Sequence, residues 1–277
     1  MKNLLMLLCI FTLTFMMSCS NETTPVTPPV TTVGINLMPL AAGNYWIQAV
    51  NDLDTLGAVL TTQTDTLTSS ATMTYKSKAA ATVINTNGGI KDTTYIASEG
   101  SKVYLSAITY EKILNGFASA FLTNFNIKLS TDWVKIADYD AATWSEPETQ
   151  LKDVPFVFNL FTGTINGTVK INGKKGTNEL ATLNSKAYTA NGYDLDVVFE
   201  GAATIMFGGQ TFKDAAIIKV SVAQKYWFID KVGLYKSKNS NTVVSLTITD
   251  PTLTNIVPSS TQQFGGRNAT TTSFKLN

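Results

Sequence analysis

The sequence predicts an all-β protein, mainly antiparallel with one short helix, whose strands follow one another as a β-meander and form a half-barrel or a sandwich. Short runs rich in β-branched and aromatic residues recur along most of the chain. Breakers that contain Gly or Asn separate these runs. Only the segment 111–125 places apolar residues at the three- and four-residue spacing of a helix.

The chain begins with a predicted signal peptide, residues 1–18. Lys2 precedes an apolar run from Leu4 to Met17, which is shorter than the roughly 20 residues of a membrane-spanning helix. Met16-Met17-Ser18-Cys19 resembles the bacterial lipobox, which implies that Cys19 is acylated and becomes the N-terminus. Two acyl chains are enough for stable anchoring. The alternative is ordinary secretion with a free Cys19 thiol.

The rest of the chain divides by composition. Residues 19–34 hold the lipidated Cys and a Thr/Pro stalk, which as an extended polyproline segment would span roughly 45 Å. Residues 35–250 are predicted to form a single β-rich domain, with a sub-boundary near 145–155. Residues 251–277 are polar, so we expect a C-terminal tail that is partly disordered or lies over the domain as an extended arm.

Within the domain, a first strand is expected at 45–50, after the Gly43-Asn44 turn. Asn-Gly and Gly-Gly pairs allow positive φ and are interpreted as tight hairpin turns at 166–167, 172–173, 191–192 and 208–209. The helix at 111–125 is expected to cap an open end of the sheet. Further strands are predicted around 83–84, 95–96 and 103–105, and at 156–161, 168–171, 195–199, 204–207, 217–222 and 242–249.

Two short pieces resemble exported lipoproteins of the Bacteroidota type. The first is Pro39-Leu40-x-x-Gly43-Asn44-x-Trp46, just after the stalk, and the second is the aromatic run from Tyr226 to Tyr235. The resemblance implies a LolA/LolB-like or lipocalin-like body and a lipid-anchored location in the outer membrane or cell envelope. It implies no site residues, and Trp46 and Trp227 are interpreted as core aromatics.

Composition excludes several functions. The chain has no histidine, so it lacks the usual general base and the commonest metal ligand. Cys9 leaves with the signal peptide and Cys19 carries lipid, so the mature chain has no thiol for catalysis or a disulfide. Its balanced charge, 21 Lys plus Arg against 20 Asp plus Glu, provides no basic surface for nucleic acid. We expect no catalytic residues, no cofactor, no metal and a monomer.

The segment 130–154 is the most polar part of the domain and holds the candidate ligand-binding residues. Carboxylates beside aromatic rings are typical of surfaces that bind sugars, and a peptide is a second candidate ligand. The alternative is a solvated loop region in which the tryptophans are partly buried. Calcium is a third interpretation, but neither 138–143 nor 52–63 completes a calcium loop. The candidate residues are Trp133, Tyr139, Trp144, Asp138 and Asp140.

The sequence therefore predicts a membrane-tethered cell-envelope lipoprotein that acts as a noncatalytic binding or interaction module. Its partners would be the membrane, through the lipid, and a glycan or peptide. An alternative is a carrier of an apolar ligand or lipid, which requires a large apolar cavity. A carboxylate-based glycan hydrolase is a distant alternative, because it requires two acidic side chains that face each other across a cleft.

Overall fold

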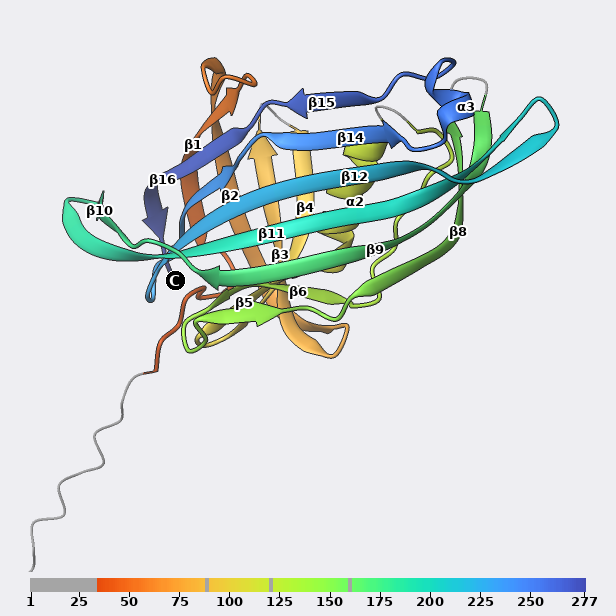
Figure 1. The fold of residues 1–277 in the computed structure, drawn as a ribbon. Helices are drawn as coiled ribbons and strands as arrows, with labels where there is room; N and C mark the ends of the chain where they lie inside the picture. The colour runs from red at the N-terminus through yellow and green to blue at the C-terminus, as the bar shows by residue number, and fades with distance from the viewer. Residues whose placement is uncertain (1–33, 88–89, 120–121, 159–160) are drawn as a thin grey trace, which may run out of the picture. The chain divides into compact units, whose positions relative to one another are not determined.

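The computed structural model describes residues 34–87, 90–119, 122–158 and 161–277 (Figure 1). The signal peptide, Cys19 and the stalk up to residue 33 lie outside these described residues. Residues 34–277 form one unit. None of its described helices has the length and apolar character needed to cross a membrane.

An antiparallel sheet of 16 strands makes up most of this unit and confirms the predicted fold class. Its main path runs β6-β5-β4-β3-β2-β1-β16-β13-β12-β11-β9-β7, so most sequence neighbours are also sheet neighbours, as in a meander. The strands are β1 (Tyr45–Leu53), β2 (Val59–Tyr75), β3 (Lys78–Asn87), β4 (Ile90–Glu99), β5 (Lys102–Ser106), β6 (Trp133–Asp138), β7 (Thr143–Ser145), β8 (Thr149–Phe158), β9 (Phe161–Lys175), β10 (Glu179–Leu183), β11 (Lys186–Phe207), β12 (Gln210–Ile229), β13 (Gly233–Asn239), β14 (Thr242–Ile248), β15 (Ser260–Phe264) and β16 (Arg267–Lys275).

Two long strands let the sheet branch. The second half of β12 pairs with β13 and its first half pairs with β14. In the same way, β11 pairs first with β10 and then with β9. Both long strands alternate buried and exposed residues, as expected when one face of a sheet covers a core and the other faces water.

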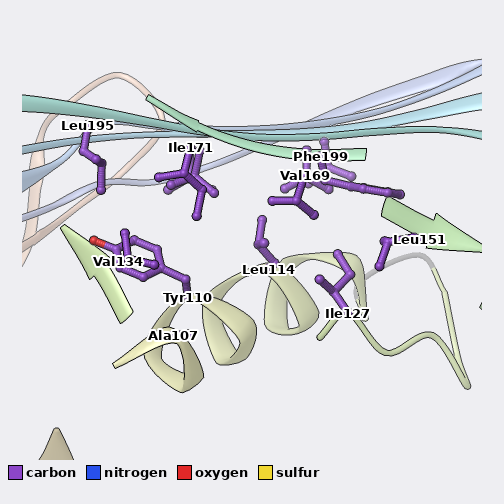
Figure 2. Packing of buried hydrophobic residues seen from close by; sticks show 14 of the residues in the cluster. Ala107, Tyr110, Leu114, Ile127, Val134, Leu151, Val169, Ile171, Leu195 and Phe199 are labelled. Carbon is purple, nitrogen blue, oxygen red and sulfur yellow. The ribbon is translucent and has the colours of Figure 1, made fainter. Parts of the chain in front are cut away.

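The core lies between the inner face of the sheet and the helix α2 (Ala107–Ala118). Tyr110 and Leu114 project from α2 towards Val169, Ile171 and Leu195 on the strands (Figure 2). Tyr110 and Leu114 are fully buried. The helix begins and ends earlier than the predicted 111–125. It starts directly after β5, and it ends before residues 120–121, which are not described.

The C-terminal segment is part of the sheet, which corrects the prediction of a polar tail at 251–277. A short helix α3 (Pro251–Thr254) leads into β15 and β16. β16 lies inside the sheet, paired with β1 on one side and β13 on the other. Its inward positions include Ala269 and Thr271, both buried. The Thr271 hydroxyl donates to the Leu234 carbonyl at 2.7 Å, so this buried polar side chain has a hydrogen-bond partner.

Three of the four predicted glycine turns are also wrong. Gly167 and Gly173 lie inside β9, and Gly192 lies inside β11; only Gly208 and Gly209 close a hairpin, between β11 and β12. The buried glycines are explained by close approach instead. A Cβ on Gly173 would stand 2.0 Å from the Trp144 ring, and one on Gly192 would stand 2.2 Å from the Thr177 carbonyl oxygen.

Candidate functional site

A polar cleft of about 540 Å³ lies where three segments meet. Tyr139 follows β6, a loop follows β9, and the third segment belongs to β11. We call it the Tyr139–Tyr193 cleft, and it is lined by Tyr139, Lys175, Gly176, Thr177, Asn178, Asn191, Gly192 and Tyr193. No carboxylate is among these lining residues.

The loop 176–178, which follows β9, is fixed to its surroundings by hydrogen bonds. The Gly176 N–H donates to the Gly192 carbonyl at 2.8 Å, and the Gly192 N–H donates to Asn178 Oδ1 at 3.2 Å. The Trp227 indole N–H donates to the Thr177 carbonyl at 3.0 Å. Side chains larger than hydrogen at 176 and 192 would press on neighbouring atoms. The cleft wall is therefore preorganised, which lowers the entropic cost of binding a ligand.

Two tyrosines line the cleft, one beside a lysine ammonium group and one buried in the wall. The Lys175 ammonium lies 5.2 Å from the centre of the Tyr139 ring, within the range of a cation–π contact. Tyr193 is 1% exposed, and its hydroxyl has no hydrogen-bond partner among the described residues. Burial raises the pKa of Tyr193, and Tyr139, Asp138 and Asp140 raise it further. The Tyr193 hydroxyl therefore stays protonated at neutral pH and remains able to donate.

The two predicted tryptophans are buried on the sheet and do not line the cleft. Trp133 is 6% exposed and donates its indole N–H to the Lys76 carbonyl at 2.9 Å. It packs edge-on against Tyr75. Trp144 is 8% exposed, donates to the Lys135 carbonyl at 2.8 Å and packs against Tyr193. Of the predicted aromatic residues, only Tyr139 lines the cleft.

The two predicted aspartates have structural partners. The Asp138 carboxylate is buried and accepts hydrogen bonds from the Lys135 ammonium at 2.7 Å and from the Asp140 and Ala141 N–H groups at 3.1 Å. Burial alone would raise the pKa of Asp138, but these donors hold it below its usual value. Asp140 is exposed and accepts from the Ser101 hydroxyl.

The described residues contain no group of three or more acidic or thiol side chains that could hold a metal ion. At the other loop considered for calcium, Asp54 Oδ1 accepts the Leu56 and Ala58 N–H groups, both at 2.8 Å. That carboxylate therefore closes a turn.

Two apolar cavities near Leu122 and Ile218 each have room for about 10 Å³, roughly one water-sized probe. The lipid-carrier alternative requires more space than either of these two cavities offers.

Side-chain hydrogen bonds connect β6 to the β7 region, at the two ends of the main strand order. No strand pairing joins these two strands within the described residues. Instead, the Lys135 N–H donates to the Glu146 carboxylate at 3.0 Å, while the Lys135 carbonyl accepts from Trp144. We call Lys135, Trp144 and Glu146 the β6–β7 seam. They satisfy backbone groups that an edge strand would otherwise leave unpaired.

The seam predicts an unusual pH dependence. Burial raises the pKa of Glu146, against weaker opposing effects of Lys135 and Lys78. An acid whose pKa is higher in the folded state stabilises the fold below its unfolded pKa, and that contribution is lost as pH rises through the folded pKa. Glu146→Gln keeps an oxygen acceptor for the Lys135 N–H without the charge. We therefore expect Glu146→Gln to raise the melting temperature at pH 7.5 and to lose this advantage near pH 4.

The matched control for this prediction is Glu148→Gln, because Glu148 is exposed and forms a surface ion pair with Lys170. Surface pairs of this kind contribute little, so this variant should melt like the wild type at both pH values. A Glu146→Gln protein that melts below the wild type at pH 7.5 would show that the attraction to Lys135 outweighs the cost of burying the charge.

Several cleft residues were not predicted from the sequence: Lys175, Gly176, Thr177, Asn178, Asn191, Gly192 and Tyr193. The signal that could have found them is the pair of Gly- and Asn-containing stretches at 176–178 and 191–192. We interpreted the second as a turn, whereas the structure places it beside the first.

Comparisons with known proteins add little to this site. No protein-family model and no curated protein match the chain. One similar solved structure is described as a candidate lipoprotein from Parabacteroides distasonis, with 13% identity over 87% of this chain and 99% of that chain, and a TM-score of 0.38. Another is described as a candidate exported protein with a YmcC-like fold from Bacteroides fragilis, with 9% identity, coverage of 87% and 100%, and a TM-score of 0.34. Likeness at this level carries no functional argument.

Proposed function

We propose that this protein is a lipid-anchored binding protein of the cell envelope that holds a glycan, without catalysis, in the Tyr139–Tyr193 cleft. The observation that carries the proposal is the polar cleft of about 540 Å³, whose wall is fixed by hydrogen bonds from the Gly176, Gly192 and Trp227 N–H groups.

The lining groups suit a saccharide. Sugars present many hydroxyls for amide and ammonium groups, and their C–H faces stack on aromatic rings. Tyr139 supplies a partly exposed ring, and Asn178 and Asn191 supply amides. The lining offers no carboxylate pair, which a glycosidase of the usual kind requires. This supports binding rather than hydrolysis.

Glycan binding is tested by thermal melting with a panel of mono- and oligosaccharides. A ligand that binds only the folded state stabilises it by about 2.7 kcal/mol at 100 times its Kd. At least one saccharide should therefore raise the melting temperature of the wild type. Tyr139→Ala should abolish the rise, whereas Tyr45→Ala, a half-buried tyrosine outside the cleft, should retain it. A panel of peptides that shifted melting where no saccharide did would overturn the choice of a glycan.

The anchor is tested separately with Cys19→Ser. Cys19 is the only cysteine that follows the predicted signal peptide, so the variant should lose its lipid and leave the membrane fraction. Its melting temperature should not change, because the folded unit spans residues 34–277. A variant that still sediments with membranes would contradict the lipoprotein assignment.

A further inference from the structure

We infer that the ligand of the Tyr139–Tyr193 cleft carries a carboxylate, which makes it an acidic saccharide such as a uronic acid. The inference rests on the proposed function and narrows its ligand class. It follows from two groups of the lining: the Lys175 ammonium, which is the only charged group there, and the Asn178 side-chain amide, whose oxygen is already used within the protein.

Three oxygen atoms of the cleft wall already accept hydrogen bonds within the protein. Asn178 Oδ1 accepts from the Gly192 N–H, the Gly192 carbonyl accepts from Gly176, and the Thr177 carbonyl accepts from the Trp227 indole. The Asn178 side chain therefore has its NH₂ group left to donate. A ligand group that meets this NH₂ has to accept hydrogen bonds.

Lys175 adds a positive charge to these donors. It is the only charged residue that lines the cleft, and its ammonium group is a donor without acceptor capacity. None of the ion pairs found among the described residues involves Lys175. Its contact with the Tyr139 ring places the charge beside the surface on which a sugar would stack.

The nearby carboxylates have cationic or hydroxyl partners of their own. Asp138 is bonded to the Lys135 ammonium, and Asp194 lies 3.4 Å from the Lys225 ammonium. Asp140 is exposed and accepts from Ser101. The charge of Lys175 is thus left for a ligand anion. Charge-assisted hydrogen bonds are roughly twice as strong as neutral ones, so a carboxylate is the group that this arrangement favours.

The experiment compares sugars that differ only at C6. Glucuronate and glucose share a ring, as do galacturonate and galactose, but the first member of each pair carries a carboxylate. At low salt, the wild type should bind the acid of at least one pair about tenfold more tightly than the neutral sugar, and added salt should reduce the ratio. Acetate should not compete at the same concentration, because it has no ring to stack on Tyr139.

Variants at two neighbouring lysines test whether Lys175 causes the preference for the acidic sugar. Lys175→Met should reduce the acid-to-neutral ratio to about one, while Lys175→Arg should retain most of it. Lys174→Met is the matched control, because Lys174 is an exposed neighbour outside the cleft lining, and it should keep the ratio. Equal affinities for acid and neutral sugar, or equal losses in Lys174→Met and Lys175→Met, would overturn the carboxylate inference while glycan binding stands. Binding of no saccharide would overturn both proposals.

Discussion

Ala269→Pro in β16 is expected to prevent folding altogether. Ala269 is 7% exposed and pairs with Val50 on one side and Ser237 on the other. Proline removes a backbone donor and is excluded from the middle of a sheet. Since β16 connects β1 to β13, its loss would separate the two halves of the sheet. Circular dichroism and thermal melting should show no cooperative transition.

The control for this prediction is Gln262→Pro in β15, which pairs with β14 alone. An edge strand tolerates proline better, so this variant should fold and melt below the wild type. A folded Ala269→Pro protein with a melting temperature like that of Gln262→Pro would show that the C-terminal segment is dispensable, as expected of a tail.

Gly173→Ala is expected to reduce the free energy of unfolding by about 3 kcal/mol. The added Cβ would stand 2.0 Å from Cε2 of Trp144, which is closer than any van der Waals contact. Trp144 cannot move away without giving up its hydrogen bond to the Lys135 carbonyl. Urea or thermal unfolding measures the loss.

Gly116→Ala is expected to have the opposite effect on stability. Gly116 is an exposed residue of α2, and nothing lies within 4 Å of the position that its Cβ would occupy. Alanine in a helix is more stable than glycine by roughly 0.5–1 kcal/mol, so this variant should be slightly more stable than the wild type. Equal stability of the two alanine variants would contradict the close packing of Trp144 over Gly173.

The fold class could be predicted because its signals are local. Runs of β-branched and aromatic residues identify pieces of the long strands from a few neighbours at a time: 195–199 and 204–207 lie in β11, and 217–222 lies in β12. The place of β16 inside the sheet could not be predicted in this way. Its core-facing positions hold Ala269 and Thr271, so the strand does not alternate large apolar with polar residues. The Asn-Gly pairs were misinterpreted for a similar reason. Whether a glycine turns the chain or makes room for a tryptophan depends on a partner distant in sequence.

The candidate site was predicted less well. The segment 130–154 contributes Tyr139 to the cleft, but its tryptophans and Asp138 have structural partners instead. The remaining lining comes from residues 175–178 and 191–193. Their proximity follows from the pairing of β9 with β11, in which Lys175 lies opposite Tyr193. Strand register of this kind is set by the whole sheet and cannot be read from either segment alone.

The location of the bound ligand is the most direct test of the central claim, that the Tyr139–Tyr193 cleft holds a glycan. Backbone amide NMR of the protein without its lipid, titrated with the saccharide that most raises the melting temperature, reports which residues sense the ligand. We predict that shifts concentrate at residues 139, 175–178 and 191–193. Shifts confined to another surface, such as the stacked rings of Tyr75 and Tyr95 on the sheet, or no saturable shift at millimolar concentrations, would contradict it.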